Sequence, residues 1–349
     1  MRRTLQLLLI VVVAGVALVA CGGGSSKEGP QQAARTAPAI KVGLLLDDVH
    51  ERWERDRDGF VEVTTGMGAE TLVEVAEGDQ ERQNQQAEKL LAAGVNVLVI
   101  VPHDADKATA IVEKAKARKV PVVSYDRLIR NADVDLFIGF NATRIGEMQA
   151  EYLLSRAPKG NYLLIGGSET DDNAKRLREG QMKILEPAVK ERAIRIIGDG
   201  WAEDWRADAA AKLTEDALAK AKNNITAIVA SNDVTAGAAI GVLEQKGLAG
   251  KVLVSGQDAE LDAVRRIVAG TQSMTVYKSL RTLTRLAARS AVMLAKGEKV
   301  DTSSVTPNGL KDVPTMMFDP IAIDKDNLDG VLIADGFHKR DDVYGKGGS

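Results

Sequence analysis

From Ile40 onward the chain alternates short apolar, β-rich runs with longer stretches that have helical spacing. The helical stretches include RQNQQAEKLLAAG and ADKATAIVEKAKARK. The apolar runs are IKVGLLL, TLVEV, VNVLVIV, VPVVSY, DLFIGF, NYLLIGG, IRIIGDG, ITAIVAS, KVLVSG and SMTVY. Continuous apolar strands that alternate with amphipathic helices indicate parallel sheets with helices on both faces. Because about ten strands are too many for one small sheet, the pattern predicts an α/β protein with two doubly wound parallel-sheet lobes.

Composition supports two folded domains and excludes several classes of protein. At about 150 residues per domain, 349 residues suggest two domains. Apolar residues make up 45% and charged residues 27%, which is typical of a globular protein and excludes disorder for most of the chain. The 46 basic and 49 acidic residues are interspersed, so the basic surface of a nucleic-acid binder is not expected.

The sequence contains no pattern that predicts a cofactor or a metal. GxGxxG, the P-loop pattern and GxSxG are all absent. His50, His103 and His338 have no shared spacing, and a single cysteine cannot form an internal disulfide. We therefore expect no cofactor, no metal site and no catalytic residue.

The N-terminus has the pattern of an export signal. Arg2 and Arg3 precede an uncharged run over residues 7–20, which is too short to span a bilayer but suits a signal-peptide core. Cys21 follows this core directly and resembles the acylated cysteine of a bacterial lipobox. The sequence predicts a signal peptide over residues 1–20 and a lipid-anchored flexible tether over residues 21–39. Such a protein would be extracytoplasmic and anchored to the cell membrane, which argues against ATP- or NAD-dependent enzymes.

The two lobes are expected to be discontinuous in sequence. The chain is predicted to cross between them near residues 140–144, 275–278 and 310–313. The N-terminal lobe would then contain residues 40–140 and 276–312, and the C-terminal lobe residues 141–275 and 313–343. Several crossing strands would form a hinge.

Polar and aromatic residues gather directly after the predicted strands, where open parallel sheets bind their ligands. These residues are of the kinds that recognise a sugar, because carboxylates, amides and cations pair with hydroxyl groups and indole packs on the apolar ring faces. The candidate ligand-binding residues are Arg52, Trp53, Asp126, Arg127, Asn173, Trp205, Asn232, Asp258 and Lys278.

Each candidate also has a structural interpretation. An Asp or Asn after a strand is a common helix N-cap, which applies to Asp126, Asn173, Asn232 and Asp258. Arg127 taken alone fits a solvated charge. Trp53 and Trp205 lie in the charged segments ERWERDRD and EDWRAD, where an ordinary core role is less expected. We expect Trp201 to serve packing, and Asp47 and Asp48 to be turn or cap residues.

The strand-end segments resemble the periplasmic sugar-binding proteins of ABC importers, in the pentose and hexose branch that includes the ribose and galactose receptors. The matching segments run in family order from about residue 41 to residue 340. They are ERWERDRD, VLVIVPHDA, YDRLI, DDNAKRLREGQMKIL, GDGWAEDW, VASNDVTAGAAI, SGQDAEL, RIVAGTQSMTVYK and NGLKDVP. ERW, YDR and TVYK are particular to the xylose receptors of this branch. One departure is visible, because the segment Val49-His50 before ERW is two residues shorter than the family pattern.

The resemblance implies a type I periplasmic binding protein that closes on a monosaccharide, with D-xylose favoured. Trp53 and Trp205 would sandwich the sugar, and the other seven candidate residues would supply polar contacts. The partner would be the ABC permease in the membrane, the protein would be monomeric, and no bond would be made or broken.

Four alternatives remain. The chain could be a sensor that presents its closed form to a chemoreceptor or histidine kinase. It could be a receptor for another aldose such as ribose, arabinose or glucose. An exported sugar hydrolase is a third possibility, although no serine lies in a nucleophile-elbow context and the adjacent Asp171 and Asp172 do not face each other across a bond. A regulator of the lactose-repressor type would need an N-terminal helix-turn-helix, in place of which this chain has a lipobox and a tether.

Overall fold

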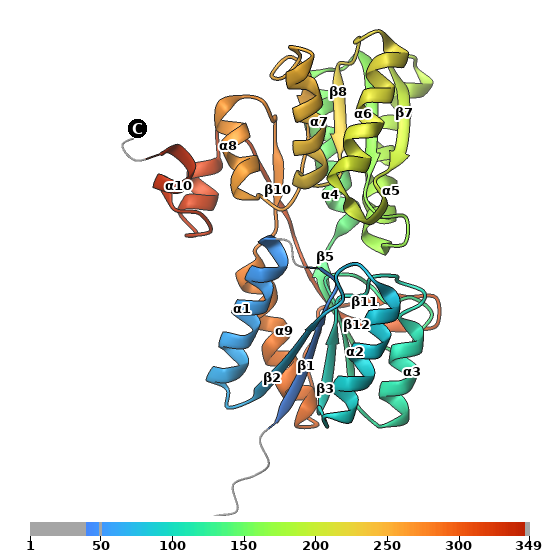
Figure 1. The fold of residues 1–349 in the computed structure, drawn as a ribbon, viewed down its shortest axis with the longest axis vertical. Coiled ribbons are helices and arrows are strands. Elements are labelled where there is room, and N and C mark those ends of the chain that lie inside the picture. The colour runs from blue at the N-terminus through green and yellow to red at the C-terminus, as the bar shows by residue number, and fades with distance from the viewer. Residues whose placement is uncertain (1–39, 49–50, 346–349) are drawn as a thin grey trace, which may run out of the picture. The chain divides into compact units, whose positions relative to one another are not determined.

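The computed structural model describes residues 40–48 and 51–345, and these residues form three sheets with helices around them (Figure 1). The predicted signal peptide, the lipidation site Cys21, the tether, and the short segment Val49-His50 lie outside the described residues. Within the described part of the chain, no helix is both long and apolar enough to cross a membrane.

The first sheet has seven strands in the order β11-β12-β5-β4-β3-β1-β2. Its strands are β1 (Lys41–Leu46), β2 (Glu70–Val75), β3 (Val97–Ile100), β4 (Val122–Tyr125), β5 (Leu136–Phe140), β11 (Ser304–Pro307) and β12 (Asp312–Phe318). All neighbouring strands are parallel except β11 and β12. Because its central strands are buried on both faces, they are continuous apolar runs in the sequence.

Helices cover both faces of this sheet. The helices α1 (Glu51–Gly66) and α9 (Leu280–Ala295) pack together over one apolar cluster, and α2 (Gln80–Ala92) and α3 (Thr109–Ala117) cover the other. The buried residues of α9 recur at the three- and four-residue spacing of one helix face. Asp79 caps α2, because its carboxylate accepts a hydrogen bond from the backbone N–H of Arg82 at 2.9 Å.

The second sheet has four parallel strands in the order β7-β6-β8-β9. Its strands are β6 (Gly160–Gly166), β7 (Ile194–Trp201), β8 (Ala227–Ala230) and β9 (Leu253–Val254). The helices around it are α4 (Ala142–Arg156), α5 (Asp172–Lys190), α6 (Ala207–Ala221) and α7 (Asp233–Gln245), together with the short 3₁₀ turn η1 (Glu203–Trp205). Figure 1 shows α6 and α7 beside each other, and their apolar residues form one core layer while those of α4 and α5 belong to another.

The backbones of α4 and α5 approach each other closely because each helix has a glycine at the contact. A Cβ atom added to Gly146 would lie 2.0 Å from the carbonyl oxygen of Leu177, and one added to Gly180 would lie 2.0 Å from that of Thr143. Since real Cβ atoms essentially never come within 3.0 Å of such atoms, no larger residue fits at either position without moving a helix.

A third, two-stranded antiparallel sheet pairs β10 (Thr275–Tyr277) with β13 (Ile321–Ile323). It shares an apolar cluster with α8 (Leu261–Ala269), the π-helical turn η2 (Asp329–Ile333) and α10 (Arg340–Tyr344). The chain leaves the seven-stranded sheet after β5, returns to it with α9, and leaves it again after β12.

The ten apolar runs correspond to β1–β10, and the doubly wound parallel sheets agree with the predicted fold class. The sequence pattern did not reveal β11, β12 or β13. The strands β11 and β12 are partly exposed and contain polar residues and a proline each, and β13 has only three residues. The pairing of β12 with β5 also places residues 312–318 in the first sheet, beyond the boundary expected after residue 312.

Candidate ligand-binding site

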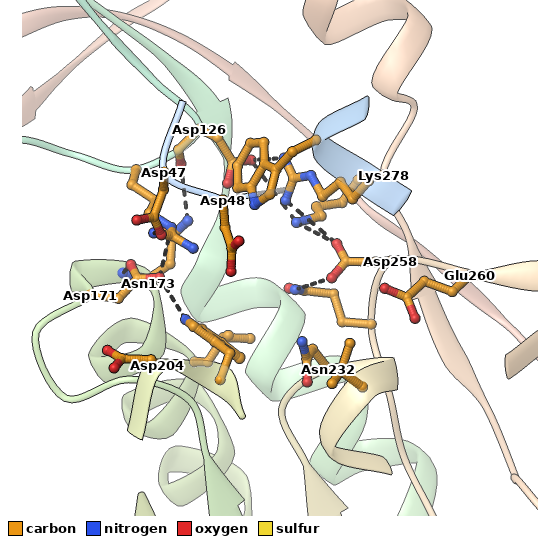
Figure 2. Close-up of a pocket in the computed structure, with 17 residues that line it drawn as sticks. Asp47, Asp48, Asp126, Asp171, Asn173, Asp204, Asn232, Asp258, Glu260 and Lys278 are labelled. Carbon is orange, nitrogen blue, oxygen red and sulfur yellow. Dashed lines mark hydrogen bonds and ion pairs between the residues drawn. The ribbon is translucent and has the colours of Figure 1, made fainter. Parts of the chain in front are cut away.

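All nine predicted ligand-binding residues line one cavity at the carboxyl ends of the strands of the two large sheets (Figure 2). The cavity contains about 580 Å³ of empty space, its open mouth included. The residues come from α1 and α5, from the segments after β4, β7, β8 and β9, and from the segment between β10 and α9.

Trp53 forms a rigid part of the cavity wall. It lies in the first turns of α1, its side chain is 4% exposed, and it belongs to the core cluster beneath the helix. The Arg52 guanidinium lies 4.3 Å from the centre of the indole ring, and that of Arg127 lies 5.5 Å away. Such cation–π contacts favour one orientation of the ring. Trp53 therefore has both roles considered from the sequence, because it is a core residue and also lines the cavity.

Arg52 is surrounded by three carboxylates. Its guanidinium contacts Asp126 at 2.5 Å, Asp56 at 3.4 Å and Asp258 at 3.5 Å. Asp56 lies behind it and accepts hydrogen bonds from the hydroxyl groups of Tyr125 at 2.8 Å and Thr284 at 3.0 Å. Because Asp56 is fixed in this way, Arg52 is held towards the cavity. Burial alone would raise the pKa of Asp126, but the charges of Arg52 and Lys278 outweigh it and hold that pKa well below its usual range.

Lys278 and Asp258 form a second ion pair at the cavity. The Lys278 Nζ lies 2.8 Å from an Asp258 oxygen and 4.0 Å from Asp126 (Figure 2). Burial would raise the pKa of Asp258, but Lys278 and Arg52 lower it on balance. Gln257 donates a hydrogen bond to the other Asp258 oxygen at 3.3 Å. Both Asp126 and Asp258 are thus charged acceptors in the cavity wall.

Arg127 joins the two sheets. It lies after β4 of the seven-stranded sheet and contacts Asp47 after β1 at 2.5 Å and Asp171 after β6 of the four-stranded sheet at 2.8 Å. Its side chain is buried, so its interpretation as a solvated charge is wrong. Asp47, expected to be a turn or cap residue, is instead a buried partner of this guanidinium and of His103.

Trp205 is held very differently from Trp53. It is half-buried, it ends the turn η1, and its φ angle of 61° places it in the left-handed region. Its indole N–H donates a hydrogen bond to Asp171 at 3.1 Å. A Cβ atom on Gly167 would lie 2.3 Å from the indole ring, so the ring occupies space that only a glycine leaves free. Gly166 provides the same space for Trp201, which does not line the cavity.

The four residues with a predicted alternative role as N-caps differ from one another. Asn232 caps α7 in a reciprocal capping box with Thr235, and it also lines the cavity. Asn173 lies one residue inside α5, whose cap is Asp171, and donates a hydrogen bond to the Asp126 carbonyl oxygen at 3.0 Å. Asp126 and Asp258 cap no helix. Their φ angles of 62° and 98° are left-handed, which costs about 1–2 kcal/mol for a non-glycine residue.

The comparison with protein families is decisive for the fold. The model of the periplasmic binding protein domain matches residues 42–299. The chain belongs to this family. A solved structure of a carbohydrate-transporter solute-binding protein from Chloroflexus aurantiacus, in complex with D-glucose, superposes with a TM-score of 0.83 at 31% identity, over 88% of this chain and 98% of that one. The predicted type I periplasmic binding protein fold is confirmed.

Two curated relatives in this family are similar over most of the chain. The D-xylose-binding periplasmic protein of Haemophilus influenzae is 46% identical over 87% of this chain and 92% of its own length. The protein of the same name from Escherichia coli is 44% identical over 89% of this chain and 94% of its own length. The relatives are thus sugar-binding proteins, in agreement with the resemblance carried by ERW, YDR and TVYK.

Sequence reasoning missed several residues that complete the site of this periplasmic binding protein. Asp48, Asp204, Gln257 and Glu260 also line the cavity (Figure 2). Asp171 contacts both Arg127 and Trp205, and it could have been found from its place two residues before the candidate Asn173. The Gly166-Gly167 pair at the end of β6 is visible in the sequence, but the reason for it depends on two indole rings more than thirty residues away.

Proposed function

We propose that this chain is an extracytoplasmic receptor that binds one monosaccharide, with D-xylose favoured, and delivers it to an ABC permease. The observation that carries the proposal is the lining of a single cavity by two indole rings and seven charged or amide side chains. Indole packs on the apolar faces of a sugar ring, and charged groups exchange hydrogen bonds with its hydroxyl groups. The nine predicted residues are our proposed sugar contacts.

The choice of D-xylose rests on the relatives. Two D-xylose-binding proteins share 44–46% identity with nearly the whole chain, whereas the structure with bound D-glucose shares 31%. A receptor for another aldose is the alternative. A site whose buried polar groups match each hydroxyl rejects a sugar that lacks one, because a protein group is then left unpaired.

We further propose that binding works by closure of two lobes. One lobe contains the seven-stranded sheet and the other contains the remaining sheets, with crossings between β5 and α4, β10 and α9, and β12 and β13. Ion pairs between the lobes support this division, including Arg127–Asp171 at 2.8 Å and Arg130–Asp172 at 3.0 Å. A sugar that contacts both lobes favours the closed state because those contacts are incomplete in the open one. Membrane anchoring through acylated Cys21 is part of the same proposal.

The charge state of the cavity favours a receptor over a glycoside hydrolase. A hydrolase needs a carboxylic acid that is protonated near neutral pH to act as general acid. The carboxyl groups of Asp126 and Asp258 face the cavity, and their cationic neighbours lower the pKa of both. Burial raises the pKa of Asp171, which also lines the cavity, but its oxygens are occupied by Arg127, the Trp205 indole and the Asn173 backbone N–H. Incubation with xylosides should therefore give no turnover.

The deciding experiment is a calorimetric titration of the chain from residue 22 onward with D-xylose, D-ribose, L-arabinose and D-glucose. We expect one-to-one binding of D-xylose, weaker binding or none of the others, and loss of binding in Trp53→Ala and Asp258→Ala. Binding of a different sugar would contradict the choice of D-xylose but not the receptor. If none of the four bound, the assignment of the nine contacts would be wrong.

A further inference from the structure

A second large cavity lies beside the sugar site, between α1, α9 and the segment that follows η2. Its empty space is about 1090 Å³, open mouth included. Its apolar and aromatic lining comes from Val63, Tyr277, Leu280 and Phe337, and the rings of Tyr277 and Phe337 meet edge to face at 4.8 Å. Arginines line its rim, and we call this cavity the arginine groove.

Three exposed arginines form a row along α9 without counter-charges among the described residues. Arg281 and Arg285 line the arginine groove one helical turn apart, and Arg289 continues the row beyond it. All three are exposed, and none has an ion pair or hydrogen bond with any residue in the described ranges 40–48 and 51–345. Like charges at this spacing destabilise a helix by about 0.2–0.5 kcal/mol per pair. The described part of the chain therefore supplies no partner that offsets this repulsion.

Acidic residues of the arginine groove do not neutralise the row. Glu62 of α1 and Asp335 also line the groove, but neither lies within ion-pair distance of the α9 arginines. Asp335 accepts a 2.5 Å hydrogen bond from the Tyr277 hydroxyl group. The rim along α9 is thus positive and open, and it suits carboxylate groups, which guanidinium binds with paired hydrogen bonds.

The groove is built from both proposed lobes. Arg55 of α1 donates a hydrogen bond to the Phe337 carbonyl oxygen at 3.0 Å, and its guanidinium lies 4.5 Å from the centre of the Phe337 ring. One turn earlier on the same helix, Arg52 faces the sugar cavity and contacts Asp258. A movement of α1 relative to the C-terminal segment changes both cavities together. A molecule that fills the arginine groove would therefore respond to the same closure that completes the sugar site.

We propose that the arginine groove receives an acidic segment of a membrane partner protein, with carboxylates on the α9 arginines and apolar side chains on the aromatic floor. This inference rests on the proposed function, since the partner is the permease that must distinguish the closed receptor. The concave shape and apolar floor favour a protein segment. An anionic bilayer could meet the row Arg281, Arg285 and Arg289, but a flat surface does not fill the groove.

The test compares two double variants of the full-length chain with equal changes in charge. The first, Arg281→Glu with Arg285→Glu, reverses the charge of the groove rim. The second, Lys220→Glu with Lys246→Glu, reverses the charge of two exposed lysines beside the four-stranded sheet, one on α6 and one in the turn directly after α7. Each is placed in cells that lack the wild-type chain, and uptake of labelled D-xylose is measured. Sugar binding is measured by calorimetry on the purified chain, and lipid binding by sedimentation with vesicles of phosphatidylcholine, with or without phosphatidylglycerol.

We expect the arginine variant to bind D-xylose like the wild type but to reduce uptake by about tenfold or more, equivalent to about 1.4 kcal/mol of partner binding. The lysine variant should leave both unchanged. Unchanged uptake in the arginine variant would overturn the proposal, as would equal losses in both variants. Loss of binding to phosphatidylglycerol vesicles in step with uptake would instead identify the membrane as the occupant. Failure of the wild-type chain to bind any sugar would contradict the proposed function, a result distinct from all of these.

Discussion

The two tryptophans of the sugar cavity are held by opposite means. Trp53 is fixed by burial, because it lies on a regular helix, belongs to the core and contacts two guanidinium groups. Trp205 is fixed by local geometry, because its left-handed backbone, its hydrogen bond to Asp171 and the space above Gly167 together set its position. The difference teaches that a change at Trp53 alters the sugar cavity and protein stability together, whereas a change at Trp205 alters the cavity with little effect on the fold.

The largest expected difference is in stability without sugar. Trp53→Ala removes a buried indole and should lower the free energy of unfolding by about 3–5 kcal/mol. Trp205→Ala removes a half-buried ring from a turn and should cost less than about 2 kcal/mol, although both changes should abolish tight binding. Urea unfolding of the two variants measures this difference. Equal losses of stability in the two variants would contradict the view that only Trp53 is held by burial in the core.

The next effect concerns Asp171, which we regard as a positioning residue for Trp205 and Arg127. Asp171→Ala removes the acceptor of the indole N–H and one carboxylate of Arg127, so D-xylose affinity should fall about ten- to hundredfold. Asp171→Asn keeps one acceptor oxygen in place of two, so it preserves either the bond from the indole N–H or the bond from the Asn173 backbone N–H at the start of α5, and it should lose less affinity than the alanine variant. Calorimetry gives the affinities, and tryptophan emission reports whether the indole has moved. Loss of affinity with unchanged emission would contradict the positioning role.

Gly167→Ala tests the space for the Trp205 ring directly. The added methyl group would lie 2.3 Å from the indole, so the ring must shift, at a cost of about 1–3 kcal/mol that appears in sugar affinity. Gly66→Ala at the end of α1 is the matched control, since a Cβ atom there has nothing within 4 Å. If both variants bind D-xylose like the wild type, the close contact does not determine the position of Trp205.

The smallest expected effect is a pH dependence near Trp205. His103 hydrogen-bonds Asp47 at 2.9 Å, and its other ring nitrogen lies 3.9 Å from Asp204, the residue before Trp205. The hydrogen bond to Asp47 and the charges of Asp47 and Asp204 raise the pKa of His103 above its ordinary 6.5, against the effects of partial burial and of Arg127. The attraction to Asp204 is therefore fully present below about pH 6.5 and is lost as pH rises through the raised pKa.

Affinity for D-xylose should accordingly be about two- to fivefold higher at pH 5.5 than at pH 8.5, the scale of a partly exposed ion pair. Asp204→Asn and His103→Gln should both flatten this profile. Tighter binding at high pH, or a profile unchanged in both variants, would exclude the contact between His103 and Asp204 as its cause.

Which residues line the cavity could be predicted from the sequence, but the contacts among those residues could not. Every candidate follows a strand, and the carboxyl ends of parallel strands meet at one edge, so Trp53 and Asp126, which follow β1 and β4 of one sheet, could be brought together without coordinates. The pairing of Arg127 with Asp47 and Asp171 could not be predicted, because it depends on how two sheets face each other. The left-handed backbone of Trp205 was equally hidden, since large aromatic residues do not favour it.

The left-handed residues of the cavity have a consequence for engineering this scaffold, for instance as a sugar biosensor. Asp126, Trp205 and Asp258 would each be replaced by glycine with relief of backbone strain. At Asp126 and Asp258 this relief is outweighed, because glycine would remove a buried counter-charge of Arg52 or of Lys278. Trp205 makes no such ion pair, so it is the position where selection for heat resistance alone most readily trades recognition for stability, and its codon should be kept fixed when this scaffold is thermostabilised.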